Sequence, residues 1–225
     1  MASSFSFSSL NPAQRQAVST LNGPVLILAG AGTGKTRTVT CRIAHMLEQQ
    51  IPASEILAVT FTNKAASEMQ ERIAGMVNKK AAKAMTVCTF HSLCVRLLRG
   101  GIHKLGYKPN FSICSHSDQI GLMKELIVRK GGINEKVKAE EVLSVISNAK
   151  NKGIDPASLD DTFFANLAVA YHNELRSRNA VDFDDLLLLG EQILREHDDI
   201  RTLFRQRFTR VTVEIVCVSH IFASY

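Results

Sequence analysis

The stretch that decides the fold is Val25-Leu26-Ile27-Leu28-Ala29-Gly30-Ala31-Gly32-Thr33-Gly34-Lys35-Thr36. Its first five residues are apolar, which predicts a short strand buried on both faces. The turn that follows has the spacing of a phosphate-binding P-loop, except that Ala29 stands where the consensus has glycine. Apolar residues then recur at helical spacing, so the turn joins a predicted strand to a predicted helix.

The chemistry of phosphate binding explains this layout. Glycines let backbone N–H groups turn inward around phosphate oxygens, and the N-terminus of a helix adds positive potential. Lys35 is predicted to reach the β- and γ-phosphates of a nucleotide, and Thr36 to offer its hydroxyl to Mg²⁺. The strand, the spacing and the helix together favour this interpretation over an incidental glycine-rich turn.

Strands and helices alternate in the first hundred residues. Further strands are predicted over Ile56–Phe61 and Met85–Phe90, with a helix between them, which implies parallel βαβ units. From about Gly101 to Asn179 the periodicity is mainly helical, with helices around 120–127, 142–149 and 167–175. Two more helices are predicted over 186–194 and 200–208, and a fourth strand over Val211–Val218.

Composition sets the broad class of protein. Of the 225 residues, 45% are hydrophobic and 21% are charged, which excludes a wholly disordered chain. The five cysteines form no CxxC pair, which argues against a disulfide framework and a zinc site. The N-terminal residues lack the pattern of a signal peptide, and no apolar segment is long enough to span a membrane. We therefore expect a cytoplasmic protein with no membrane partner.

The positive charge is concentrated in one stretch. The net charge is +6, from 27 basic and 21 acidic side chains. No acidic residue occurs between positions 72 and 117, where the basic residues are Arg72, Lys79, Lys80, Lys83, Arg96, Arg99, Lys104 and Lys108. This asymmetry indicates an anionic partner, although Lys79 to Lys83 are expected to form only a solvated loop.

Five motifs carry a resemblance to a known family. They are Leu10–Val18, which contains Gln14, then Ala29–Arg37, Thr60–Ala66, Thr89–Ser92 and Asp182–Leu187. In order and interval they resemble the UvrD/Rep/PcrA-type superfamily 1A DNA helicases from about residue 10 to 208. The resemblance implies an α/β fold, a RecA-like P-loop NTPase domain with a parallel sheet flanked by helices and a helical insertion domain. The implied domains are 1A over residues 1–100, helical 1B over 101–180, and a return to 1A over 181–225.

The resemblance also implies ligands and the residues that bind them. The ligands are ATP, Mg²⁺ and single-stranded or partially duplex DNA. Gln14 is expected to recognise adenine, because a side-chain amide offers a donor and an acceptor side by side. The residues expected to bind ATP are Gln14, Ala29, Gly30, Ala31, Gly32, Thr33, Gly34, Lys35, Thr36 and Arg37. Lys35 and Thr36 are also expected to be catalytic, and Thr36 to bind the metal ion. The residues expected to contact DNA are Thr60, Phe61, Thr62, Asn63, Thr89, Phe90 and His91.

Elementary chemistry supports these DNA contacts but leaves alternatives open. Both segments end predicted parallel strands, where ligands bind in open α/β sheets, and Phe61 offers a face on which any base can stack. Core packing is an equal alternative for Phe61 and Phe90, and helix capping for His91. For Asp182, Asp184 and Asp185, a helix cap with a capping-box partner at Asp185 is favoured over a metal site.

The sequence departs from the family after Phe208. An Asp-Glu pair is expected after the last strand, but Glu214 falls near the Asp position and Ile215 stands where the catalytic Glu is expected. We expect no second RecA-like domain, with its arginine fingers, within these 225 residues. We expect the N-terminal piece of a longer 3′–5′ helicase, truncated or frame-shifted near Arg210 and inactive alone. The alternatives are a non-catalytic module that binds nucleotide and single-stranded DNA and, last, an unrelated P-loop kinase or transporter ATPase.

Overall fold

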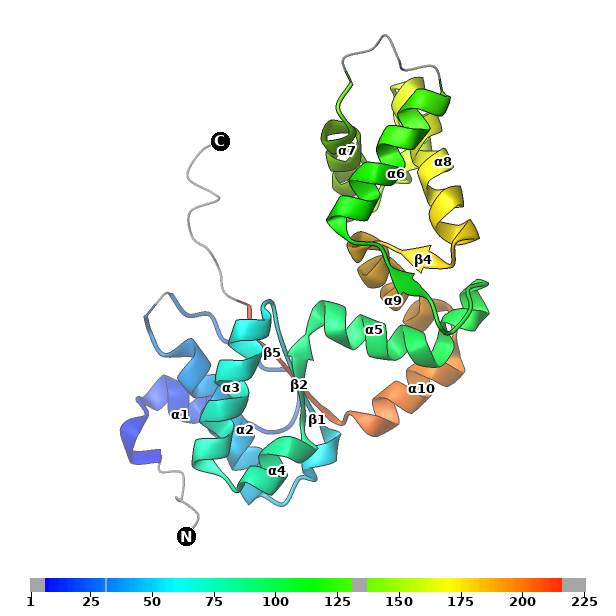
Figure 1. Ribbon diagram of the computed structural model, residues 1–225. Helices are drawn as coiled ribbons and strands as arrows, with labels where there is room; N and C mark the ends of the chain where they lie inside the picture. Colours follow the sequence, from blue (N-terminus) through cyan, green and yellow to red (C-terminus); the bar gives the residue numbers. More distant parts are fainter. Residues whose placement is uncertain (1–6, 31, 131–136, 216–225) are drawn as a thin grey trace. The chain divides into compact units, whose positions relative to one another are not determined.

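A computed structural model describes residues 7–30, 32–130 and 137–215 (Figure 1). The chain forms two compact units, and each is described here by itself. Unit 1 comprises the chain up to Leu93 and again from Thr202, and unit 2 comprises Cys94–Arg201. The boundaries fall inside helices α5 (Phe90–Gly101) and α10 (Asp198–Arg207).

Unit 2 is longer than the predicted insertion of residues 101–180. The difference arises because α5 and α9 (Phe183–Glu196) contribute to one core of unit 2. Its fully buried members include Leu98 from α5 and Leu186 and Ile193 from α9. The identification of the two units with domains 1A and 1B stays a prediction.

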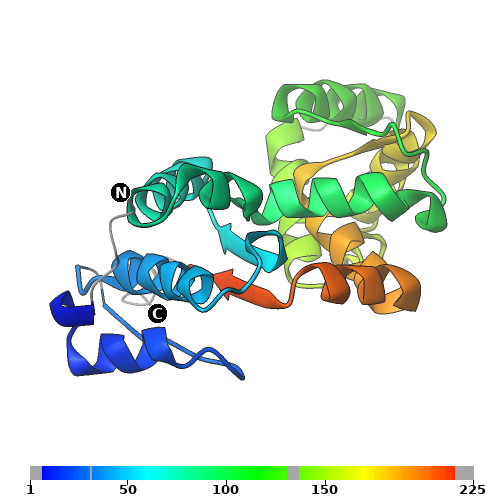
Figure 2. The same cartoon turned by 90° about the horizontal axis from the view of Figure 1, so that it is seen from below.

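The sheet of unit 1 is parallel, as predicted. Its strand order is β2 (Thr86–Thr89), β1 (Ile56–Thr60), β5 (Arg210–Val213), and all five residues of β1 are buried. Helices α2 (Lys35–Glu48) and α3 (Asn63–Met76) pack on the sheet through a core that includes Ile43, Ile56 and Met69. The remaining helices of this unit are α1 (Pro12–Ser19), which lies beside α2, the short α4 (Lys79–Ala84), and two 3-10 turns, Phe7–Ser9 and Ala53–Glu55 (Figures 1 and 2).

The prediction of a strand over Val25–Ala29 is wrong, because the structure has no strand there. This segment joins no strand ladder of the described sheet, and Leu26 and Leu28 are 83% and 87% exposed. The described sheet ends at β5, and the segment makes no ladder with the outer edge of that strand. The segment is nevertheless anchored beside β5, because Arg210 donates to Asn22 at 3.4 Å before it and Lys35 donates to the carbonyl of Ile215 after it.

Unit 2 is mainly helical, as predicted. Helices α6 (His116–Arg129), α7 (Ala139–Asn151) and α8 (Thr162–Ser177) enclose a core that includes Met123, Val142 and Leu167. The further elements are α9, a parallel pair β3 (Ser112–Ile113) and β4 (Ala180–Val181), and the 3-10 turns Ile102–Leu105 and Pro156–Ser158. Strands of two residues are too short to show a period, so this pair was not predicted. Among the described helices, none has the length and apolarity needed to cross a bilayer.

Candidate functional site

The P-loop turn is built on two glycines in the left-handed region. Gly32 has φ of 76° and Gly34 has φ of 86°, a conformation that side chains with a Cβ rarely adopt. Gly34 is the N-cap of α2 and gives no side-chain cap, so the first N–H groups of α2 stay available to an anion. Thr33 closes the turn by donating to the carbonyl of Gly30 at 2.7 Å. Ala31 lies outside the described residues.

The two residues after the turn meet the end of β5. The Thr36 hydroxyl donates to the Glu214 carboxylate, and Lys35 Nζ donates to the carbonyl of Ile215 at 3.2 Å. Glu214 is only 5% exposed, and its N–H donates to the carbonyl of Val59. A hydroxyl beside a carboxylate is an oxygen donor pair that suits Mg²⁺, so these residues fit the expected metal ion.

Glu214 was not among the candidate site residues. The sequence places Glu214 near the position of the family's Asp, but its contact with Thr36 spans 178 residues of sequence. Only the pairing of β5 with β1, which fixes where β5 ends, reveals that contact. Ile215, which follows it, contributes only its backbone carbonyl to the polar contacts described for this site.

Gln14 lies against the P-loop from the other side. Its Nε2 donates to the carbonyl of Thr33 at 3.1 Å, and its Oε1 accepts from the N–H of Asn11. The second bond is half of a capping box that starts α1. A Cβ added at Gly34 would lie 3.1 Å from Gln14 Nε2, so the amide and the turn are in close contact. The structure thus brings Gln14, Gly34 and Lys35 together, while Arg37 is exposed on the first turn of α2.

The residues expected to contact DNA differ in exposure. Thr60 and Thr89 are paired in the ladder of β1 and β2, and the residues after them, Phe61 and Phe90, meet edge to face at 5.8 Å between ring centroids. Phe61 is 64% exposed, and Thr62 and Asn63 are exposed beside it.

The side chains of Thr60 and Thr89 are turned inward. Thr60 is 1% exposed and donates to the carbonyl of Thr62, whereas Thr89 is 6% exposed and accepts from the N–H of Ser92 in the first turn of α5. His91 is half-buried in the same turn. The exposed surface at these strand ends is therefore formed mainly by Phe61 to Asn63.

The basic residues between positions 72 and 108 are divided between the two units. Arg72 is on α3, and Lys79, Lys80 and Lys83 form an exposed face of α4, a helix where a loop was predicted. Because α4 leads into the start of β2, it lies at the edge of the sheet opposite Phe61 (Figure 1). The loop predicted over Lys79 to Lys83 is therefore wrong, because these residues form a helix.

The other four basic residues belong to unit 2. Two of them have local roles there: Arg99 stacks on Phe111 at 4.1 Å and donates to the carbonyl of Pro109, and Lys104 pairs with Asp199 at 2.6 Å. Much of the basic stretch is therefore accounted for by contacts within unit 2 and by the far edge of the sheet in unit 1.

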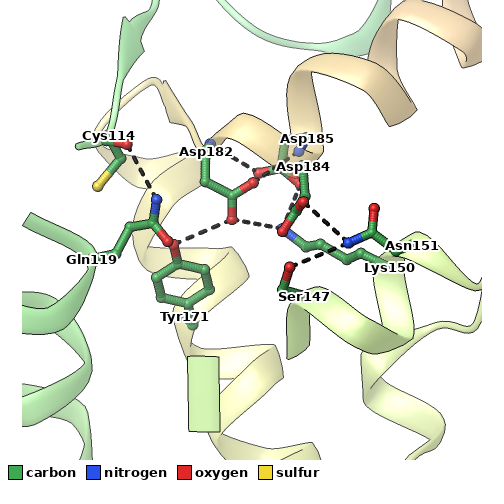
Figure 3. Close-up of polar contacts among 9 residues, drawn as sticks. All are labelled: Cys114, Gln119, Ser147, Lys150, Asn151, Tyr171, Asp182, Asp184 and Asp185. Carbon is green, nitrogen blue, oxygen red and sulfur yellow. Dashed lines mark hydrogen bonds and ion pairs between the residues drawn. The ribbon is translucent and has the colours of Figure 1, made fainter. Parts of the chain in front are cut away.

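The acidic motif that ends at Asp185 forms a buried ion-pair cluster in unit 2 (Figure 3). Asp182 and Asp185 make the predicted capping box at the start of α9. Between them lies the ammonium of Lys150, at 2.8 Å from Asp182 and 2.6 Å from Asp185, and Tyr171 donates to Asp182 at 3.2 Å. The ammonium of Lys150 lies where a metal ion between the two carboxylates would lie, and no metal-binding cluster is found among the described residues.

This cluster predicts a loss of stability in alkali. Burial disfavours the ammonium, but the Asp185 and Asp182 carboxylates raise the pKa of Lys150, and burial together with Asp182 raises the pKa of Tyr171. Both groups therefore bind their protons more tightly in the folded chain than in the unfolded chain. Their contribution is complete below the unfolded values of about 10 and is lost as pH rises through the folded values.

We therefore expect the free energy of unfolding to fall from about pH 10 upward. Urea unfolding followed by circular dichroism between pH 7 and 11 measures this. Tyr171→Phe removes one of the two groups and is expected to flatten the decline. An equal decline in wild type and variant would contradict the role given to Tyr171.

The chain is similar to DNA helicases over most of its length. The model of a family described as UvrD/REP helicase N-terminal domain matches residues 10–214. The ATP-dependent DNA helicase Rep of Salmonella typhimurium is 39% identical over 214 residues, which cover 91% of this chain and 32% of that protein. ATP-dependent DNA helicase PcrA of Leuconostoc citreum is 40% identical over 213 residues, covering 91% of this chain and 28% of that protein.

A third relative gives the same coverage. ATP-dependent DNA helicase UvrD1 of Mycobacterium tuberculosis is 43% identical over 218 residues, covering 91% of this chain and 28% of that protein. The chain thus spans about a third of the length of these curated relatives.

Proposed function

Because the chain belongs to the UvrD/REP helicase N-terminal domain family, we propose that it is the portion of a 3′–5′ DNA helicase that binds ATP and single-stranded DNA. The whole protein would couple ATP hydrolysis to movement along one strand and to unwinding of the duplex. The observation that best supports this is the P-loop between Gln14 and Glu214, at the same edge of the sheet as Phe61.

Each side of this site has a part in binding ATP. Gln14 contacts the adenine, the N–H groups at the start of α2 bind the phosphates, and Lys35 neutralises phosphate charge. Thr36 and Glu214 would hold Mg²⁺, which supplies further neutralisation of the triphosphate when bound. For this purpose the present bonds of Lys35 to Ile215 and of Thr36 to Glu214 must open.

Hydrolysis needs groups that the described residues do not supply. The side chain of Ile215 cannot orient water, because it has no polar atom, and the resemblance places arginine fingers on a second RecA-like domain. For the chain alone we therefore favour binding without turnover, the non-catalytic module among the alternatives.

An ATPase assay with and without oligo-dT tests this distinction. We expect background rates together with measurable binding of a fluorescent ATP analogue. Turnover above background that disappears in Lys35→Ala would show that the chain is an enzyme by itself. Absence of both turnover and nucleotide binding would refute the proposed function.

Phe61 gives the prediction for DNA. Its exposed ring lies at the carboxyl end of β1, and stacking of a base on an aromatic ring contributes about 1–3 kcal/mol. Phe61→Ala is therefore expected to weaken binding of labelled oligo-dT by roughly 5- to 150-fold, measured by fluorescence anisotropy.

The control is Phe183→Ala, which removes a ring of similar exposure from α9. We expect that change to leave affinity within about twofold, and wild-type affinity to fall steeply with added salt. If both phenylalanine variants bind oligo-dT like wild type, the stacking role of Phe61 is wrong.

A further inference from the structure

Helix α2 carries a buried cation that the proposed ATP site does not use. Arg42 lies two turns beyond Lys35 on α2 and is 8% exposed. Its Nη1 donates to the carbonyl of Ala17 at 2.6 Å and also to the carbonyl of Thr20. Burial lowers the pKa of this guanidinium and the nearby Arg210 adds to the effect, yet arginine keeps its charge in proteins.

These two carbonyls belong to the C-terminal end of α1. The last carbonyls of a helix lack partners within it and carry partial negative charge, which a cation stabilises. The last turn of α1 has no basic residue of its own. Arg42 supplies that cation from α2, and next to it Val18 and Cys41 pack together in a small buried cluster.

The other end of α1 carries Gln14. The helix has only eight residues, too few to be stable without tertiary contacts, so its position depends on what fixes its ends. Arg42 fixes the C-terminal end, and the bond from Gln14 to the carbonyl of Thr33 joins the N-terminal end to the P-loop. Ala17 and Gln14 are less than one turn apart, so a shift at Ala17 moves the Gln14 amide as well.

We propose that Arg42 is a positioning residue for base recognition, which acts by clamping α1 so that the Gln14 amide stays beside the P-loop. The inference rests on the proposed adenine role of Gln14. It separates two parts of ATP affinity: the base depends on α1 and its clamp, whereas the phosphates depend on the P-loop and the start of α2. Loss of Arg42 should therefore weaken selection of the base and spare binding of the phosphates.

The test measures dissociation constants for ATP, GTP and inorganic tripolyphosphate by calorimetry. In wild type we expect ATP to bind at least about fivefold more tightly than GTP, and in Gln14→Ala we expect a ratio near one. Arg42→Met, which keeps the length of the stem but no donor, is expected to bring the ratio at least halfway to that of Gln14→Ala. Its tripolyphosphate affinity should remain within about twofold of wild type.

A double variant and a matched control make the result specific. The double variant Gln14→Ala/Arg42→Met is expected to have the same ratio as Gln14→Ala, because both changes act through one amide. Arg15→Met is the matched control: Arg15 is on α1 but donates to the carbonyls of Phe7 and Leu10 before the helix, so the ratio should not change. Arg42→Gln, which keeps a neutral donor, replaces Arg42→Met under the same criteria if the methionine variant does not fold.

The outcomes distinguish the adenine role of Gln14 from the clamping role of Arg42. A wild-type ratio near one refutes the adenine role of Gln14, and the role of Arg42 with it. If Gln14→Ala removes the preference for ATP but Arg42→Met keeps it, the proposed function stands and the clamp is wrong. A uniform loss of affinity for all three ligands in Arg42→Met also refutes the clamp, because it indicates a structural role alone.

Discussion

Replacing Lys35 with alanine is expected to weaken binding of ATP by this chain by about a hundredfold. The ammonium of Lys35 is at the start of α2, where the phosphates of a bound nucleotide would lie, and its present partner is only the carbonyl of Ile215. A hydrogen bond between two charged groups contributes roughly 1.5–3 kcal/mol, and Lys35 is placed to reach two phosphates. Titration with a fluorescent ATP analogue measures the effect.

Lys79→Ala is the control for Lys35→Ala. Lys79 carries the same charge on α4, at the opposite edge of the sheet, so its loss changes the net charge equally without touching the site. We expect ATP affinity within about twofold of wild type. If Lys35→Ala binds ATP no more weakly than Lys79→Ala, the P-loop does not bind the triphosphate as proposed.

Replacing Lys150 with methionine is expected to destabilise unit 2 by about 3–5 kcal/mol, the usual cost of removing one partner of a buried ion pair. The substitution leaves the carboxylates of Asp182 and Asp185, which are 3% and 6% exposed, without their counter-charge. The expected result is a urea unfolding transition at lower concentration, measured by circular dichroism at pH 7. Because the chain has two compact units, the transition of unit 2 is the one that moves.

Two variants check this interpretation. Lys152→Met removes an exposed lysine two residues further on and is expected to change stability by less than about 0.5 kcal/mol. Lys150→Met combined with Asp185→Asn should recover part of the loss, because one buried charge is then removed with its partner. A Lys150→Met chain as stable as Lys152→Met would mean that the cluster is not a buried ion pair in solution.

The sequence predicts best those structural features that depend on residues close together in the chain. The helical spacing of Val39 and Ile43 is sufficient for α2, and Asp182 with Asp185 is sufficient for the capping box of α9. The similarity of the five motifs to a helicase family is confirmed by the match over residues 10–214. The helical spacing and the capping box can each be recognised from a few neighbouring residues, and the family from the order of short motifs along the chain.

Contacts between distant residues could not be predicted in this way. An apolar run such as Val25–Ala29 has the composition of a strand, but its composition does not determine whether it pairs with a neighbouring strand. The pairing of Thr36 with Glu214 and of Lys150 with Asp182 likewise depends on how separate elements come together. The burial of Thr60 and Thr89 likewise depends on the pairing of β1 with β2, which leaves both side chains buried.

The close approach of Gly34 to Gln14 limits which residues the P-loop turn can contain. A side chain at position 34 would meet the left-handed backbone and the Gln14 amide at once. Glycine at position 34 is therefore favoured for two independent reasons, the left-handed backbone and the neighbouring amide.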